Sequence, residues 1–265
     1  MLVGGEVSFL GVMLVCVLCG LAGFVDAIAG GGGLISLPAY MIVGLPAQVA
    51  AGSNKLSACL GSSIAIVKYG RSGAIRWREA LIGLVLALVG GGLGASLAVS
   101  LPERALKWLI VGALPFVGFY MALRGVPKDG GSGIDEEREG VGLWLPPACL
   151  GLGIGLYDGL IGPGSGTFLI VAIVAWMKYD LVTASANAKV LNWGANVASL
   201  AVFIFNRSVR YDIALPAAVA TMIGGYLGAT FCLKFGSSWV RKMLFVVLFL
   251  LLVKLLWDLL APAMT

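Results

Sequence analysis

The chain has 265 residues, of which 60% are hydrophobic and only 12% are charged, and its mean hydropathy is +1.00. Soluble domains carry about 25% charged residues, so this composition excludes an ordinary soluble domain and predicts an integral membrane protein. The net charge of +5 does not indicate nucleic-acid binding, because most Lys and Arg residues lie between apolar runs, where they set orientation in the membrane.

The N-terminus does not indicate a signal peptide, and the cysteines do not indicate a metal or redox site. Glu6 and no basic residue precede the first apolar run, so we expect no cleaved signal peptide. Cys16 and Cys19 form a C-x-x-C, but the chain has no histidine and no second such pair. We therefore interpret the five cysteines as small apolar residues, and we expect no metal site and no cofactor.

Apolar runs predict two successive series of helices. In the first series a helix over residues 8–29 ends at glycines 30–33, a short helix follows at 34–44, and longer helices cover 47–69, 79–100 and 105–123. In the second series a helix over 142–161 ends at a break over 162–166, and helices follow to about 177, at 181–205 and at 239–260. We divide the chain into a first transmembrane repeat at 1–124, a cytoplasmic linker loop at 125–141 and a second transmembrane repeat at 142–265.

The two series share residues at a nearly constant spacing. Pairs in corresponding places are Asp26 and Asp158, Gly30 and Gly162, Gly32 and Gly164, Lys55 and Lys189, and the motifs Gly90-x-x-x-Gly94 and Gly224-x-x-x-Gly228. The paired glycines on one helical face predict close helix contact. Together these pairs predict an internal duplication, within an all-α polytopic membrane protein of eight to ten helical crossings.

The number of crossings per repeat decides the topology. If the short helices turn back without crossing, each repeat has four crossings and the repeats are parallel, with loop Lys and Arg residues divided 9 to 6. If they cross, each repeat has five crossings and the repeats are inverted, with a division of 11 to 4. The positive-inside rule therefore favours inverted repeats with both termini outside.

Lys55 and Lys189 lie well inside apolar helices, where a lysine is costly and usually faces a polar interior. Polar neighbours on the same helices indicate that one face of each is wet: Ser53, Asn54, Ser57, Asn187, Asn192 and Asn196. Glycine breaks at membrane depth free backbone groups, and the short helices after them point positive N-terminal ends at the midplane. Two lysines and two such ends predict an anion-binding site.

Asp26 and Asp158 precede the breaks by four residues and leave two interpretations open. They couple substrate movement to protons if they are protonated in the cycle, or they form neutral buried ion pairs, Asp26 with Lys55 and Asp158 with Lys189. Tyr157 and Trp193 are weaker candidates for the pathway. The predicted substrate-binding residues are Lys55, Lys189, Gly31, Gly32, Gly33, Gly164, Ser165, Gly166, Thr167, Asn54, Asn187 and Asn192, and Asp26 and Asp158 are the predicted proton-coupling residues.

The sequence does not favour an enzyme. Without histidine the usual base for Ser165 is missing, which leaves only a Ser165–Lys189 dyad. Neither glycine stretch continues into the Gly-Lys-Ser/Thr of a nucleotide-binding loop. We therefore assign no catalytic residue.

Three stretches of the chain carry a resemblance to a known family: residues 23–33 with Pro38, residues 155–166 and residues 186–192. At these stretches the chain resembles the TauE/SafE family of bacterial membrane permeases, and the third is similar to its YfcA-type branch. The resemblance covers essentially the whole chain. It implies transport of a small sulfur-containing anion such as sulfite, a sulfonate, sulfoacetate or thiosulfate, together with protons or in exchange for them. Pro163 and Ser165 depart from the all-glycine run of the first repeat, so the two half-sites need not be equivalent.

We therefore expect a secondary active transporter that works by alternating access between its two halves, located in the bacterial inner membrane as a multi-pass protein. A passive anion channel is the alternative, whereas a structural scaffold fits poorly with charges at lipid depth. The expected partners are a small anionic substrate and the lipid bilayer. Nucleic acid is not expected, and a homodimer is left open, as are the identity of the anion and the direction of transport.

Overall fold

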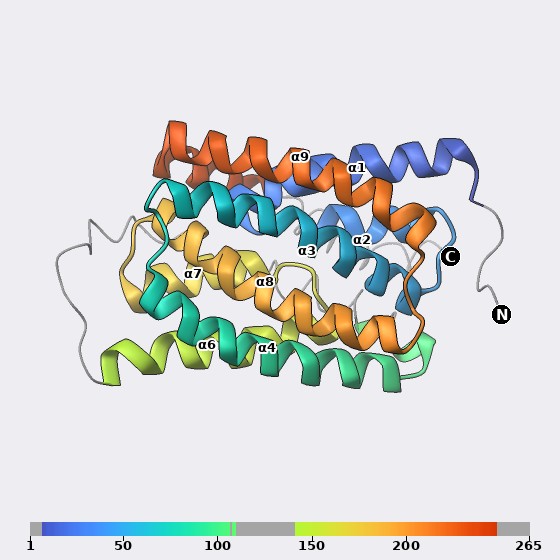
Figure 1. Cartoon of the computed structure of the whole chain (residues 1–265), viewed down its shortest axis with the longest axis horizontal. Helices are drawn as coiled ribbons and strands as arrows, with labels where there is room; N and C mark the ends of the chain where they lie inside the picture. Colours follow the sequence, from blue (N-terminus) through green and yellow to red (C-terminus); the bar gives the residue numbers. More distant parts are fainter. Residues whose placement is uncertain (1–6, 107, 110–140, 248–265) are drawn as a thin grey trace, which may run out of the picture.

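The computed structural model describes residues 7–106, 108–109 and 141–247, which form helices and short connections (Figure 1). This confirms the predicted all-α class for the described part of the chain. The labelled helices are α1 (Phe9–Ala29), α2 (Gly33–Ile42), α3 (Ala47–Arg71), α4 (Trp77–Ser100), α6 (Val141–Leu160), α7 (Ser165–Met177), α8 (Leu181–Phe205) and α9 (Tyr211–Phe235). The helix predicted at 105–123, the linker at 125–141 and the second half of the helix predicted at 239–260 lie outside the described residues, apart from a few at their edges.

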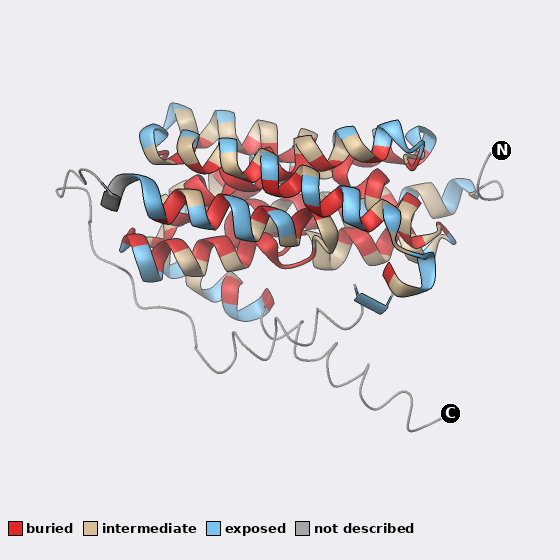
Figure 2. Ribbon diagram, turned by 90° about the horizontal axis from the view of Figure 1, so that it is seen from below, coloured by how far each residue is buried: buried red, intermediate tan, exposed pale blue. Residues whose placement is uncertain are grey.

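Four helices in the described ranges are long and apolar enough to cross a membrane: α1, α4, α8 and α9. Large apolar side chains also cover the outer face of α4, where Leu81, Val85, Val89, Leu93 and Leu97 recur every four residues and are each about half exposed. Figure 2 shows the buried residues along the inside of the bundle and the exposed ones on its outer faces. The apolar outer face is that of a membrane protein, whereas the total of eight to ten crossings stays a prediction.

Both predicted breaks are present, and left-handed glycines make them. Gly30 ends α1 with φ of 72°, and its amide donates to the carbonyl of Asp26 at 3.0 Å. Gly162 and Gly164 have φ of 91° and 85° between α6 and α7. The second break is shorter than predicted, because helix α7 already begins at Ser165, so Gly166 is helical.

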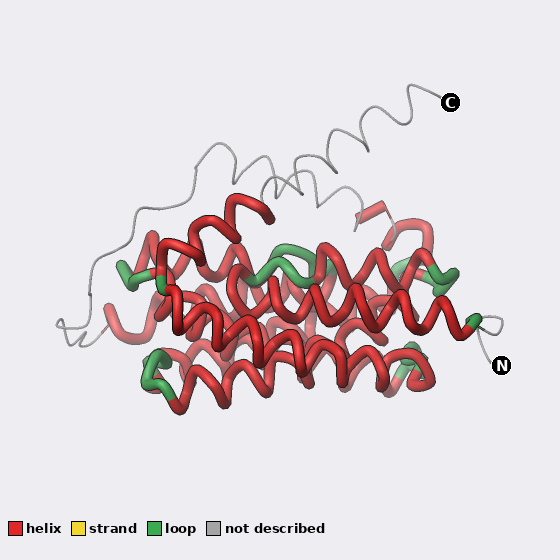
Figure 3. The backbone as a smooth tube through the Cα atoms, turned by 90° about the horizontal axis from the view of Figure 1, so that it is seen from above, coloured by secondary structure: helices red, strands yellow, loops and turns green. Residues whose placement is uncertain are grey.

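After each break the chain turns back. The end of α2 packs beside the start of α1, where Val43 approaches Gly11, and in the second half Leu169 of α7 lies beside Leu150 of α6. Each break is thus the tip of a helical hairpin. Figure 3 shows the two tips as loops near the middle of the bundle rather than at its ends.

The helices pack as two layers that do not coincide with the two halves of the sequence. Helix α9 packs on α1 and α3, and helix α4 packs on α6 and α8. We call α1, α2, α3 and α9 the first bundle, and α4, α6, α7 and α8 the second bundle (Figure 1). Each half therefore supplies one helix to the bundle of the other half.

The G-x-x-x-G motifs make the exchanged contacts. Gly224 and Gly228 of α9 lie against the main chain of Gly20 and Phe24 in α1. In the same way Gly90 and Gly94 of α4 lie against the main chain of Leu152 and Leu156 in α6. The predicted close contact is confirmed, because a side chain at any of these four glycines would overlap the neighbouring backbone.

These contacts also give the helix directions. Residue numbers rise together along α1 and α9 and along α4 and α6, so each of these pairs is parallel. Helices α3 and α8 are antiparallel, because Gly52 near the start of α3 lies against Phe203 and Ser208 at the end of α8. Helices α3 and α8, which occupy corresponding places in the two halves, therefore run in opposite directions. Whether the halves are repeats of one another stays a prediction.

Most of the described basic residues gather at one end of the bundle. Lys68 and Lys234 line one groove there, and Tyr179, next to Lys178, bonds Glu79 near the start of α4 at 3.1 Å. Arg207 and Arg210 lie at the other end, where the Arg210 amide donates to Ser53 Oγ. By the positive-inside rule we predict that the first end, which also carries Arg71, Arg76 and Arg78, faces the cytoplasm.

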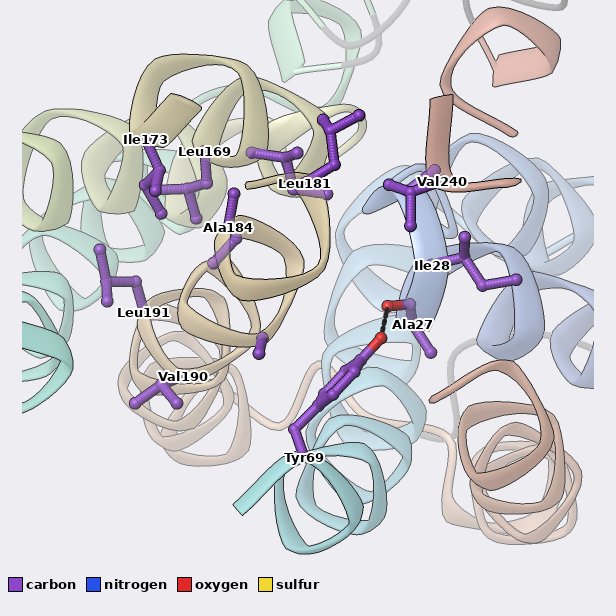
Figure 4. Close-up of a cluster of buried hydrophobic side chains, with 14 of the residues drawn as sticks. Ala27, Ile28, Tyr69, Leu169, Ile173, Leu181, Ala184, Val190, Leu191 and Val240 are labelled. Carbon is purple, nitrogen blue, oxygen red and sulfur yellow. Dashed lines mark hydrogen bonds between the residues drawn. The ribbon is translucent and has the colours of Figure 1, made fainter. Parts of the chain in front are cut away.

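The buried core lies between the hairpins and the long helices (Figure 4). Tyr69 is fully buried in it, and its hydroxyl donates to the carbonyl of Ala27 at 2.8 Å. This bond satisfies one of the carbonyls that the break leaves without a helical partner. Leu169 and Ile173 of α7 pack in the same cluster, so the apolar core holds each hairpin in place.

We predict that Gly30→Ala destabilises the protein by about 2 kcal/mol or more, because a side chain there would adopt a left-handed conformation and overlap the main chain of Gly166. The matched control is Gly153→Ala, a helical glycine of α6 with open space around its Cβ position. The melting temperatures of the two variants are compared by heating detergent-purified protein and measuring the folded fraction by size-exclusion chromatography. Equal melting temperatures for the two variants would contradict the tight contact between the breaks.

Candidate functional site

The two glycine breaks meet where the two bundles meet. The main chain of Gly30 lies against that of Gly166, and Gly33 lies against Pro163. Thr167 Oγ1 donates to the carbonyl of Ala29 across the same contact at 2.8 Å. A side chain at Gly30 or at Gly166 would overlap the opposite main chain, which explains why glycines occupy these two positions.

Two ion pairs flank this contact, and both are crossed between the halves. Lys55 Nζ lies 2.6 Å from Asp158 Oδ2, and Lys189 Nζ lies 2.6 Å from Asp26 Oδ2. The alternative pairing within each half, Asp26 with Lys55 and Asp158 with Lys189, is therefore wrong. The hairpins of the two halves lie tip to tip, so each lysine reaches the aspartate of the opposite hairpin.

Each lysine also binds the main chain of the helix end that it faces. Lys55 Nζ donates to the carbonyl of Asp158 at 2.7 Å, and Lys189 Nζ donates to the carbonyl of Asp26 at 2.6 Å. A cation favours the C-terminal end of a helix, where carbonyls lack helical partners. The break, the aspartate before it and the opposite lysine thus form one structural unit, and this unit occurs twice.

A small cavity of about 30 Å³ lies beside the breaks. At roughly 10–15 Å³ for each water, it has room for about two water molecules. Its polar lining comes from both bundles and consists of Asp26, Ser36, Asn54, Lys55, Ser57, Asp158, Ser165, Asn192, Asn196 and Thr221, with Gly30, Gly32, Gly33, Gly162 and Gly164.

The two aspartates differ in their surroundings. Asp158 accepts from Lys55, from the hydroxyl of Ser165 and from Asn192 Nδ2, and its side chain is 5% exposed. Asp26 accepts from Lys189 and from the amide of Gly32 at 3.3 Å, and its side chain is 20% exposed. The predicted inequivalence of the half-sites thus has a structural counterpart, because Asp26 is the carboxylate with fewer donors and more room.

Two asparagines line the cavity, and they differ in whether their amide oxygen has a hydrogen-bond partner. Asn192 Nδ2 donates to Ser165 Oγ at 3.1 Å, and Asn192 Oδ1 accepts from Asn196. Asn54 is 7% exposed, and its Oδ1 has no hydrogen-bond partner. A buried amide oxygen without a partner is costly, so Asn54 is the side chain of this cavity most ready to bind a donor from a ligand or water.

Several predicted site residues lie outside the cavity lining. Asn187 Oδ1 accepts the amide of Arg76 at the start of α4, and Ser53 does the same for Arg210 at the start of α9. Gly31 faces Val247, and Gly166 and Thr167 pack against the first break. Lys189 reaches the site only through Asp26. These residues hold the helices in place around the cavity.

The structure adds Ser36, Ser57, Asn196 and Thr221 to the lining. Asn196 follows Asn192 by one helical turn, so the sequence carried a signal for it. Thr221 lies in an otherwise apolar stretch of α9, and only the packing of α9 on the first bundle brings it to the cavity.

The weaker candidates have local partners. The hydroxyl of Tyr157 donates to the carbonyl of Pro163, and the Trp193 indole donates to Ser63. Ser165 donates to Asp158, and Lys189 donates to Asp26, so the two do not form a dyad. Within the described residues no three His, Cys, Asp or Glu side chains form a group that would hold a metal ion.

Apolar outer faces, broken helices that meet near mid-bundle and buried charges at the breaks together define the class of membrane transport proteins with discontinuous helices. Residues 15–255 match the family described as "Sulfite exporter TauE/SafE". The chain belongs to this family.

Relatives over nearly the whole length carry transporter names. The chain is 33% identical over 239 residues to "Probable membrane transporter protein YfcA" of Escherichia coli (strain K12), which covers 90% of this chain and 87% of that protein. It is 32% identical over 238 residues to "Probable membrane transporter protein ORF9" of Sinorhizobium sp, covering 90% and 89%. A Haemophilus influenzae protein named "Probable membrane transporter protein" is 32% identical over 243 residues, covering 89% and 91%. No solved structure matches the chain.

A double-mutant cycle tests the crossed pairing. We predict that Lys55→Met alone destabilises the protein by about 3–5 kcal/mol, because it leaves Asp158 as an unpaired buried charge. Adding Asp158→Asn recovers a large part of this loss, whereas adding Asp26→Asn does not. Melting of the three single variants, the two double variants and the parent measures both couplings, and a larger coupling of Lys55 to Asp26 would refute the crossed arrangement.

Proposed function

We propose that this chain is a secondary active transporter of a small sulfur-containing anion, coupled to protons. The family description, "Sulfite exporter TauE/SafE", names sulfite, and our proposal extends the substrate class to sulfonates, sulfoacetate and thiosulfate. The observation that carries the proposal is the pair of crossed Lys–Asp bridges beside a small polar cavity. We place the protein in the bacterial inner membrane as a multi-pass protein, in agreement with its apolar outer faces.

Charge balance explains why protons would be involved. Two lysines and two aspartates give the cavity and its surroundings no net charge, so an anion entering the site gains little from them. A proton on one carboxylate leaves one lysine uncompensated, and at low dielectric that charge attracts an anion strongly. The anion and the proton therefore favour each other's binding, which is the condition for coupled transport.

We assign the coupled proton to Asp26, because its carboxylate is the more accessible of the two. Its side chain lines the cavity and is 20% exposed, whereas Asp158 is 5% exposed and accepts from three side chains. In this proposal the Asp158–Lys55 pair holds the site together. The Asp26–Lys189 pair responds to the proton, and Asn54 Oδ1, which has no hydrogen-bond partner, accepts from a hydration water of the bound anion.

In this proposal the two bundles move relative to each other during transport. Both ion pairs and the contact of Gly30 with Gly166 cross the interface between them. A rocking of one bundle against the other would open the cavity first to one side and then to the other, which is alternating access. The cavity of about 30 Å³ is too small for a sulfonate, so this structure corresponds to a closed state of the cycle.

A passive anion channel is the second candidate, because it would use the same charges. The small volume of the cavity and the backbone contact between the breaks favour a transporter, since a channel needs a continuous path. Accumulation against a gradient separates the two, because a channel cannot concentrate its substrate.

Uptake into proteoliposomes tests the function directly. With an imposed proton gradient we expect accumulation of at least one of the anions sulfite, thiosulfate and sulfoacetate, or of the zwitterionic sulfonate taurine, and we expect a protonophore to abolish it. Acetate serves as the carboxylate control. Lys189→Ala should reduce this uptake at least tenfold, because it removes the charge that protonation of Asp26 releases. Unchanged uptake of every tested sulfur anion in this variant would end the proposal.

Substituting asparagine for Asp26 or for Asp158 distinguishes a role in proton coupling from a role in stability. Asp26→Asn mimics the protonated carboxyl, so we expect anion exchange to persist while accumulation driven by a proton gradient is lost. Asp158→Asn leaves Lys55 without its counter-ion in the less exposed pair, so we expect a lower melting temperature than for Asp26→Asn. Proton-driven accumulation by the Asp26→Asn protein would show that another group carries the proton.

A further inference from the structure

A second site lies at the basic end of the bundle, in a groove of about 590 Å³ between α3 and α9. Its lining shares no residue with the mid-bundle cavity and consists of Ile64, Val67, Lys68, Arg71, Ser72, Tyr226, Thr230, Leu233 and Lys234. We call this surface the α3–α9 groove. Transport as proposed above makes no use of it.

The rim of the groove is cationic. Lys68 and Arg71 lie in the last turn of α3, and Lys234 lies in the last turn of α9. No acidic side chain is among the residues that line the groove in the described structure. The two helix ends contribute about half a negative charge each, so roughly two of the three positive charges remain without compensation.

The wall below the rim is apolar. Ile64 lies seven residues before Arg71, which is about 10 Å along a helix at 1.5 Å per residue. Val67 is 49% exposed and Tyr226 is 47% exposed on this wall. The ring of Tyr226 lies under Lys68, with Nζ 5.2 Å from its centroid. The groove therefore joins three cations near the membrane surface to an apolar wall that points into the bilayer.

We propose that the α3–α9 groove binds an anionic glycerophospholipid of the cytoplasmic leaflet. The phosphate lies among Lys68, Arg71 and Lys234, and one acyl chain lies along Val67 and Tyr226. Basic pockets between helices on the cytoplasmic side suit such headgroups. A zwitterionic lipid fits less well because its own ammonium group competes for the phosphate, and free phosphate has nothing to place on the apolar wall.

Native mass spectrometry of the full-length protein with added lipids tests this site. We expect the protein to retain cardiolipin or phosphatidylglycerol but not phosphatidylethanolamine, and we expect 10 mM inorganic phosphate not to displace the lipid. The triple variant Lys68→Gln, Arg71→Gln, Lys234→Gln should bind the anionic lipid about 100-fold more weakly, because each basic residue near such headgroups contributes about fivefold.

Two controls distinguish the groove from general surface charge. The triple variant Arg78→Gln, Lys178→Gln, Lys242→Gln removes three exposed charges near the same end, away from the groove, and should bind within twofold of the parent. Val67→Trp keeps every charge but fills the apolar wall, and it should weaken lipid binding at least tenfold. Equal losses in the two triple variants, full binding by the Val67→Trp protein, or equal retention of phosphatidylethanolamine would each overturn the proposal.

Discussion

The interior of this protein depends on one constraint: two lysines that are buried among apolar helices must each meet a negative charge. The structure meets it by crossing the partners, so that Lys55 binds Asp158 and Lys189 binds Asp26. A buried charge without its partner costs several kcal/mol, so neither half of the chain can hold its lysine without the other half. The same bridges that neutralise the site therefore join the two bundles, and any movement between the bundles acts on them.

The glycine breaks make this arrangement geometrically possible. A helix that ends inside the bundle presents its last carbonyls there, and each lysine binds one of these carbonyls together with the carboxylate of the same residue. Because the breaks touch through Gly30 and Gly166, both helix ends lie at the bundle interface. The two units are alike in design but not in detail, since Ser165 and Asn192 bind only one of the two carboxylates. That difference is the structural basis for assigning stability to one pair and proton coupling to the other.

The kinds of side chain on the outer surface change along the length of the bundle. Apolar side chains cover the outer face of α4, and the described basic residues gather mainly at one end of the bundle. At that end the α3–α9 groove combines both kinds of surface within one concave site. The membrane thus has two roles in our account: it makes the buried charges costly enough to require pairing, and it supplies the amphipathic ligand that the groove fits.

The sequence by itself determined the membrane class, the presence of a helix break at Gly30 and another near Gly162, the helix at 181–205 and the position of Lys55 and Lys189 inside apolar helices. These features follow from local physics, because apolar length, glycine conformation and the cost of a charge at lipid depth can be read along the chain. Only the tertiary structure decided which aspartate each lysine binds, that α4 and α9 exchange bundles, and that Asn187 supports a helix start while Thr221 lines the cavity. Those outcomes depend on which helices pack together, and a helix pattern with apolar residues on every side does not specify its neighbours.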